Sequence, residues 1–171
     1  KASPAWKLRV TDGAGAAIAL HQTKPGEFTA EGPGLSLHAV LRPVGAIHEL
    51  ALAAANGGTD WRKLEVAIDL VPPPGPDLVI WDGASEYDAR KPISNDLMLS
   101  HFPLTLAYRA GGEGVGAGLA PGAWISYFRR EFVPNERASF VIRLAVPAGG
   151  RAEVPMVLVG WRNEFGFREA L

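Results

Sequence analysis

The sequence contains no cysteine, and its 17 lysine and arginine residues are balanced by 18 aspartate and glutamate residues. Without cysteine, disulfide frameworks, thiol nucleophiles and thiolate-bound metals are excluded. Without a basic excess, the electrostatic footprint of a nucleic-acid-binding protein is missing. No apolar run approaches the roughly 20 residues that a membrane-spanning helix needs. We therefore expect neither a nucleic-acid partner nor a membrane span.

Glycine and proline are abundant, with 20 and 14 of the 171 residues. Together they make up about a fifth of the chain, against roughly 12% in an average protein, which argues against a helical bundle. Hydrophobic residues at 47% and charged residues at 20% are typical of a globular protein rather than a disordered one. These proportions indicate a compact domain rich in turns.

Apolar and polar residues alternate in many short segments, and this period of two is typical of strands with one buried face. The predicted strands, separated by turns rich in glycine and proline, cover residues 6–10, 18–21, 35–41, 47–54, 59–70, 78–81, 104–108, 114–119, 123–132, 139–146 and 153–159. Many short strands at such spacing indicate an all-β fold of about 10 to 13 strands. We predict a two-sheet antiparallel β-sandwich, supersandwich-like, with the start of a helix at the C-terminus over residues 163–171.

The alternation of apolar residues identifies the core most clearly in two of these strands. The inward-facing positions are Leu64, Val66 and Ile68 in one strand and Phe140, Ile142 and Leu144 in the other. Glu65 and Asp69 lie on the opposite face of the first strand, which we expect to be half-exposed. We interpret residues 1–171 as a single β-sandwich domain and a piece of a longer chain, since the sequence starts at Lys1 and its final helical segment has no C-cap.

The sequence contains only incomplete versions of three known functional motifs. His48-Glu49 lacks the second histidine of a zinc-protease helix, and Ser85 lacks the glycines of a nucleophile elbow. The glycine-rich stretch 111–118 is flanked by strands, so no helix N-terminus is available for a phosphate. We expect no catalytic residue in this chain.

Metal binding is weakly supported. His21, His38, His48 and His101 lie on separate predicted strands or loops, where partly exposed histidines are more common than ligands. Asp82, Glu86 and Asp88 could supply oxygen ligands to calcium, although a solvated acidic loop is the more frequent explanation. We expect no cofactor, and calcium at this loop is the open alternative.

The tryptophans suggest a carbohydrate ligand. The five tryptophans are Trp6, Trp61, Trp81, Trp124 and Trp161. β-Sandwiches that bind sugars use exposed aromatic rings as stacking platforms, although a tryptophan on a strand more often lies in the core. We predict that the loop opened by Trp81 contacts ligand, through Trp81, Asp82, Tyr87, Asp88 and Arg90. The competing interpretation is a solvated connector with Trp81 packed into the core.

The second half of the chain resembles the N-terminal β-sandwich region of large bacterial glycoside-hydrolase-like proteins. The stretches that carry the resemblance are residues 101–108, residues 114–121 and residues 164–171. In that family the last stretch opens a helical link to a catalytic barrel, but Phe165 stands here in place of a tryptophan. The resemblance implies that catalytic carboxylates lie beyond Leu171.

Two functions follow as hypotheses. The first is a non-catalytic accessory module of a secreted carbohydrate-active protein, which supports a downstream catalytic domain and contacts carbohydrate. The second is a structural or protein-interaction sandwich of a bacterial surface or periplasmic assembly. Under either hypothesis we expect a secreted, periplasmic or cell-surface location.

Overall fold

The computed structural model describes residues 5–45, 47–71, 77–82, 85–88, 103–109, 113–123, 127–134 and 137–161. Within these ranges the regular structure consists of strands, and no helix there is long and apolar enough to cross a membrane. The helix start predicted at residues 163–171 lies outside the described residues.

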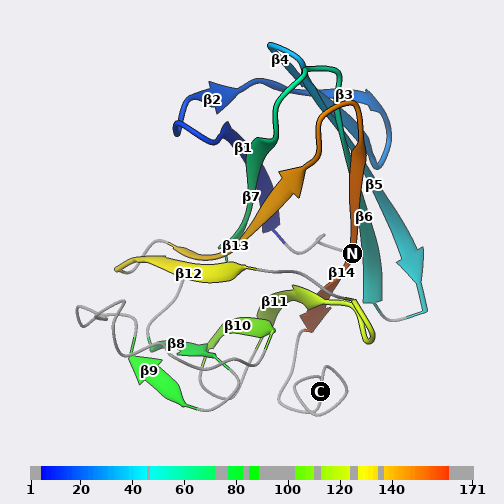
Figure 1. The fold of residues 1–171 in the computed structure, drawn as a ribbon. Coiled ribbons are helices and arrows are strands. Elements are labelled where there is room, and N and C mark those ends of the chain that lie inside the picture. The colour runs from blue at the N-terminus through cyan, green and yellow to red at the C-terminus, as the bar shows by residue number, and fades with distance from the viewer. Residues whose placement is uncertain are drawn as a thin grey trace.

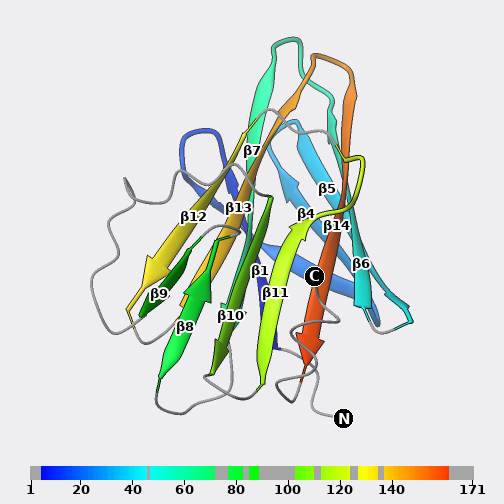
Figure 2. The same ribbon diagram turned by 90° about the horizontal axis from the view of Figure 1, so that it is seen from below.

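The described strands form two antiparallel sheets packed face to face (Figures 1 and 2). In chain order the strands are β1 (Ala5–Asp12), β2 (Ala17–Ile18), β3 (Leu20–Lys24), β4 (Glu27–Gly32), β5 (Leu35–Val44), β6 (Ile47–Asn56), β7 (Arg62–Val71), β8 (Leu78–Trp81), β9 (Glu86–Asp88), β10 (Leu104–Arg109), β11 (Gly114–Leu119), β12 (Phe128–Val133), β13 (Arg137–Val146) and β14 (Arg151–Trp161). The five-stranded sheet has the order β12-β13-β7-β1-β2, and the nine-stranded sheet has the order β3-β4-β5-β6-β14-β11-β10-β8-β9. The predicted two-sheet antiparallel sandwich is confirmed.

The predicted core positions are confirmed. All six are at most 4% exposed: Leu64, Val66, Ile68, Phe140, Ile142 and Leu144. They meet directly across the β7–β13 pair, where Leu64 lies opposite Leu144 and Ile68 opposite Phe140. They belong to one core cluster with residues of the nine-stranded sheet, including Leu50, Leu52 and Leu158. The local period of two therefore identified the inner faces of both strands.

Local patterns missed three features of the strand order. The strand predicted at 18–21 divides at Ala19, because β2 pairs with β1 in one sheet and β3 pairs with β4 in the other. β4 lies between two glycine turns and β9 lies within the polar loop after Trp81, and neither was predicted as a strand. These short strands are stabilised by their neighbours, so their own sequences carry a weak signal.

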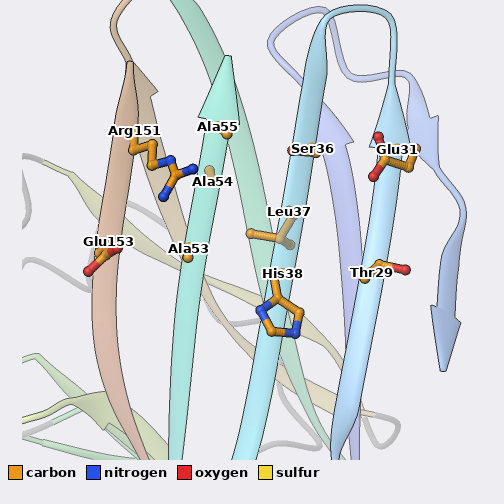
Figure 3. Close-up of a pocket in the computed structure, with 10 residues that line it drawn as sticks. All are labelled: Thr29, Glu31, Ser36, Leu37, His38, Ala53, Ala54, Ala55, Arg151 and Glu153. Atoms are coloured by element: carbon orange, nitrogen blue, oxygen red, sulfur yellow. The ribbon is translucent and has the colours of Figure 1, made fainter. Parts of the chain in front are cut away.

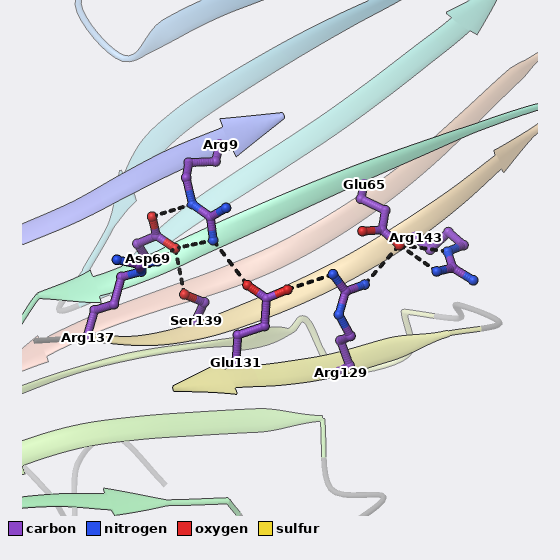
Figure 4. A network of polar contacts seen from close by, with 8 residues as sticks. All are labelled: Arg9, Glu65, Asp69, Arg129, Glu131, Arg137, Ser139 and Arg143. Atoms are coloured by element: carbon purple, nitrogen blue, oxygen red, sulfur yellow. Dashed lines mark hydrogen bonds and ion pairs between the residues drawn. The ribbon is translucent and has the colours of Figure 1, made fainter. Parts of the chain in front are cut away.

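The outward face of β7, predicted to be half-exposed, is covered by ion pairs (Figure 4). Asp69 is 4% exposed, and Arg9 on β1 binds its two carboxylate oxygens at 2.7 and 3.0 Å. The hydroxyl of Ser139 donates to the same carboxylate at 2.6 Å. Burial by itself would raise the pKa of Asp69, but the hydrogen bonds from Arg9 and Ser139 outweigh it and hold that pKa below its usual range.

The same row of ion pairs continues across the sheet. Glu131 on β12 contacts Arg9 at 3.3 Å and Arg129 at 2.6 Å. Arg129 and Arg143 in turn bind Glu65 at 2.8 and 2.6 Å, and the hydrogen bond from Arg129 is the main cause of a lowered pKa for Glu65. Charges on this face therefore satisfy one another across four strands.

Truncation of Ile142 to alanine is expected to lower the free energy of unfolding by about 2–5 kcal/mol, because a fully buried side chain leaves a cavity. Chemical denaturation followed by tryptophan fluorescence would measure the change. Val44→Ala is the control, since Val44 is 44% exposed and its truncation should change stability by less than about 0.5 kcal/mol. A loss below about 1 kcal/mol for Ile142→Ala would contradict the assigned core.

Candidate functional site

The predicted ligand loop begins at Trp81, whose side chain is half-buried. Trp81 packs with Leu104 and Tyr108 around Leu106, on the side of the nine-stranded sheet away from the main core. Its ring thus contributes to a small second apolar cluster. Whether it also contacts a ligand stays a prediction.

Asp82 has an internal role. It is 1% exposed, and its carboxylate accepts hydrogen bonds from the Ser85 amide at 2.9 Å and the Tyr87 hydroxyl at 3.2 Å. Burial is the main cause of the raised pKa of Tyr87, and the Asp82 charge adds to it. The Asp82 backbone carbonyl accepts from Arg130 on β12 at 2.8 Å. These bonds hold the start of the loop against the five-stranded sheet.

The remaining loop residues lie on or beyond β9. Asp88 is half-buried opposite Val79, and Arg90 lies outside the described residues. Glu86 accepts a hydrogen bond from the Tyr108 hydroxyl, and burial together with this carboxylate raises the pKa of Tyr108. Among the described residues, no three histidine, aspartate or glutamate side chains gather closely enough to hold a metal ion. The calcium hypothesis gains no support there.

A hollow of about 270 Å³ lies elsewhere, on the outer face of the nine-stranded sheet (Figure 3). Four adjacent strands, β4, β5, β6 and β14, contribute its lining, which consists of Thr29, Glu31, Ser36, Leu37, His38, Ala53, Ala54, Ala55, Arg151 and Glu153. Leu37 and Ala54 are buried core residues beneath it. The other eight alternate with the core residues, so their side chains face outward.

Strand register sets these outward side chains in two rows. The first row across the four strands is Thr29, His38, Ala53 and Glu153. The second is Glu31, Ser36, Ala55 and Arg151. Small side chains on β5 and β6 form the floor, and ionisable side chains stand around it. In Figure 3 the Arg151 guanidinium points from β14 toward β6, while Glu31 lies on the far side of β5.

The ionisable groups of the hollow are not paired with each other. Arg151, Glu31, Glu153 and His38 are all exposed, and none makes a side-chain hydrogen bond or ion pair with another described residue. This contrasts with the five-stranded sheet, where Arg9 binds both Asp69 and Glu131. The hollow therefore presents free donors and acceptors around a small apolar floor.

Sequence reasoning missed this hollow. Glu31 falls between the strands predicted at 18–21 and 35–41, and His38 has only the sequence pattern of a partly exposed strand residue. A faint signal was available on β6, where alanines at 51, 53 and 55 alternate with the core residues Leu50, Leu52 and Ala54. Such a pattern predicts a shallow outer face. It does not reveal which charged residues of other strands surround that face.

The tryptophans differ in exposure. Trp6 is half-buried against the core. Its ring meets the His48 ring edge-on, with 5.3 Å between the ring centroids. Trp61 is 70% exposed, the largest value among the exposed large hydrophobic residues of the described ranges. Trp124 and the side chain of Trp161 lie outside the described set. Among the tryptophans whose side chains the structure describes, Trp61 is thus exposed, while Trp6 and Trp81 are half-buried.

Comparison with known proteins shows the fold. No protein-family model matches the chain, and no curated protein matches it in sequence. Its structure is similar to a crystal structure from Escherichia coli named as a candidate aldose 1-epimerase, with a TM-score of 0.52 and 9% identity over 89% of this chain and 71% of that chain. A galactose mutarotase related enzyme from Lactobacillus acidophilus has a TM-score of 0.48 and 8% identity over 86% and 72%. The chain thus shares its β-sandwich fold with the candidate aldose 1-epimerase from Escherichia coli.

Proposed function

We propose that this chain is a carbohydrate-binding β-sandwich, an accessory module of a carbohydrate-active protein, and that the hollow holds the sugar. The observation that carries the proposal is the unpaired set of ionisable side chains around the hollow. Elsewhere on the described surface, a comparable row of charges is internally paired. Unpaired donors and acceptors in a concave site are suited to a polar ligand.

The chemistry of the hollow matches a sugar ring. Each sugar hydroxyl both donates and accepts, and the hollow offers guanidinium and imidazole donors beside carboxylate acceptors. Ala53 and Ala55 form a flat apolar floor that fits the C–H face of a pyranose. The volume of about 270 Å³ lies just below the usual range for small-molecule pockets, which suits a single sugar unit.

The likeness to the protein from Escherichia coli adds support at the level of fold, since that protein is named for an aldose reaction. Similarity of fold alone does not determine function, so the proposal rests on the hollow. We propose that the module belongs to a secreted, periplasmic or cell-surface protein, because glycans are accessible in these locations. In this proposal a catalytic domain of the same protein follows the sandwich.

Substitution of Arg151 by alanine tests the proposal. Calorimetry against glucose, galactose, mannose, xylose, glucuronic acid and N-acetylglucosamine should show binding of at least one sugar by the wild type. Loss of the charged hydrogen bonds of Arg151, worth about 1.5–3 kcal/mol, should weaken that binding at least about tenfold. Arg42→Ala is the control, because Arg42 is exposed on β5 beyond the hollow. It should bind like the wild type.

Two results would contradict this function. If the wild type binds none of these sugars, the structural or protein-interaction hypothesis is favoured instead. If sugar binding survives unchanged in Arg151→Ala, the sugar binds elsewhere, and the Trp81 loop becomes the next candidate. Circular dichroism of each variant should match the wild type, because Arg151 is exposed and its side chain makes no hydrogen bond or ion pair with another described residue.

A second candidate function is catalysis of sugar anomer exchange in the same hollow. His38 and Glu153 lie in one row with Ala53 between them, two strand spacings or roughly 10 Å apart at the backbone. An imidazole and a carboxylate on either side of a sugar can serve as general acid and base. Exchange spectroscopy by NMR on glucose and galactose would detect faster anomer exchange, and His38→Gln should abolish it.

A further inference from the structure

The two sides of the hollow differ in charge. On the β14 side, Arg151 and Glu153 are two residues apart on the same face, so a cation and a carboxylate balance each other there. On the β4 side, Glu31 is the one ionisable residue among the described residues that line the hollow. The register places Glu31 three strand spacings from Arg151, about 14 Å at the backbone. This separation exceeds the screening length of about 8 Å at physiological salt. Arg151 therefore does not neutralise the charge of Glu31.

No other cation among the described residues binds Glu31. It is exposed and makes no side-chain hydrogen bond or ion pair with another described residue. Lys24, on the neighbouring strand β3, contacts Glu27 at 3.6 Å instead. On the five-stranded sheet, by contrast, Glu65 and Glu131 are each bound by arginine. The Glu31 carboxylate is thus open to a cationic ligand.

A second acceptor lies beside this carboxylate. Ser36 on β5 is directly opposite Glu31 on β4, which places their Cβ atoms about 5 Å apart. Figure 3 shows the Glu31 carboxylate directed toward β5, the strand that carries Ser36. The serine hydroxyl can rotate to accept a hydrogen bond. An ammonium group has three donors and no acceptor, so a carboxylate next to a hydroxyl complements it.

We propose that the hollow selects an amino sugar, whose ammonium group binds at Glu31 and Ser36. The ring then lies over Ala53 and Ala55, and its hydroxyls face Arg151, whose guanidinium points from β14 toward β6 in Figure 3. This inference rests on the proposed sugar-binding function and adds a specificity for the charge of one substituent. A neutral sugar lacks the charge-assisted hydrogen bond to Glu31. A uronic acid brings a second carboxylate into a hollow whose formal charge, from two carboxylates and one guanidinium, is already −1 with histidine neutral.

Calorimetry at pH 7, where an amine of this kind is largely protonated, tests the selectivity. The ligands are glucosamine, galactosamine and mannosamine, each beside its parent sugar and its N-acetyl form. At least one amino sugar should bind at least about tenfold more tightly than its parent sugar, because hydrogen bonds between charged groups are strong. The N-acetyl form should lose this advantage. Raising the salt concentration from about 20 to about 500 mM should reduce it, since Glu31 is exposed and its charge is screened.

Three glutamine variants locate the ammonium group. Glu31→Gln keeps the shape of the side chain, and the ratio of amino-sugar to parent-sugar affinity should fall from at least tenfold to within about twofold. Glu153→Gln, on the opposite side of the hollow, should keep at least half of the ratio. Glu49→Gln is the control, because it removes an exposed carboxylate from β6 beyond the hollow, and it should change neither affinity. Thermal melts should be alike, since all three glutamates are exposed.

The possible results separate this inference from the sugar-binding function. If the wild type binds amino and parent sugars equally, or if Glu31→Gln keeps the preference, the selectivity is wrong while the function stands. Loss of the preference in Glu153→Gln instead of Glu31→Gln would contradict the assigned position of the ammonium group. Cyclohexylamine carries the ammonium without hydroxyls, and binding as tight as that of the amino sugar would also contradict the inference. If the wild type binds no sugar of either kind, the proposed function and this inference both fall.

Discussion

Replacing Arg130 by methionine is expected to lower the free energy of unfolding by about 3–5 kcal/mol, because it removes one partner from a buried polar cluster. Arg130 is 6% exposed and donates to the Thr105 hydroxyl at 2.8 Å and to the Asp82 carbonyl at 2.8 Å. Burial lowers the pKa of Arg130, and the charge of Asp82 opposes that shift. Methionine fills similar space but leaves these buried acceptors without a donor.

Urea denaturation of Arg130→Met, Arg130→Lys and the control Arg42→Met would measure this effect. Arg42 is exposed, so its replacement should change stability by less than about 0.5 kcal/mol. Lysine restores the charge but lacks the planar fork of arginine, and we expect it to recover only part of the loss. A cost below about 1 kcal/mol for Arg130→Met would show that the cluster does not hold the two sheets together.

Replacing Asp69 by asparagine is expected to lower the free energy of unfolding by about 1.5–3 kcal/mol at pH 7, the range for hydrogen bonds to a charged group. Asparagine loses the charge that binds Arg9 and turns an amide donor toward its guanidinium. The cost stays below that of a fully buried pair because the Arg9 side chain is 42% exposed and water can solvate it again. Thermal and chemical denaturation would give the difference from the wild type.

The cost of Asp69→Asn should depend on pH in a defined direction. The folded-state pKa of Asp69 is lowered, so its contribution is fully present above the unfolded value near 3.9 and is lost as the pH falls through the folded value. The gap between wild type and variant should therefore be constant from pH 5 to 7 and shrink below about pH 4. Glu49→Gln, at an exposed position, should show no such narrowing. A gap that does not change down to pH 2 would contradict the ion-pair assignment.

Much of the fold could be read from local patterns. The alternation in β7 and β13 identified six core residues, since the side-chain period of a strand directly reports its buried face. The same alternation did not predict the burial of Asp69. Its position in the pattern faces outward as predicted, but Arg9 and Ser139 from two other strands cover it. Burial on that face depends on neighbours that lie about 60 and 70 residues away in sequence.

The candidate site was much harder to predict. Trp81 and Trp61 are both tryptophans next to polar residues, and composition does not separate them. Trp81 lies in a strand and packs around Leu106, while Trp61 stands on a loop fixed by the Asn56 amide. That difference arises from contacts across the sheet and between turns, which short-range patterns do not encode.

By itself the sequence determined that the protein is an all-β sandwich with a core of alternating apolar positions, because strand periodicity is local and acts within a few residues. The tertiary structure alone decided which charges are paired and which remain open. Arg151 and Glu31 come from distant parts of the chain, and the register of four strands places them on opposite sides of one hollow. Register follows from the packing of whole strands, and a shift of one residue would turn each of these side chains to the opposite face.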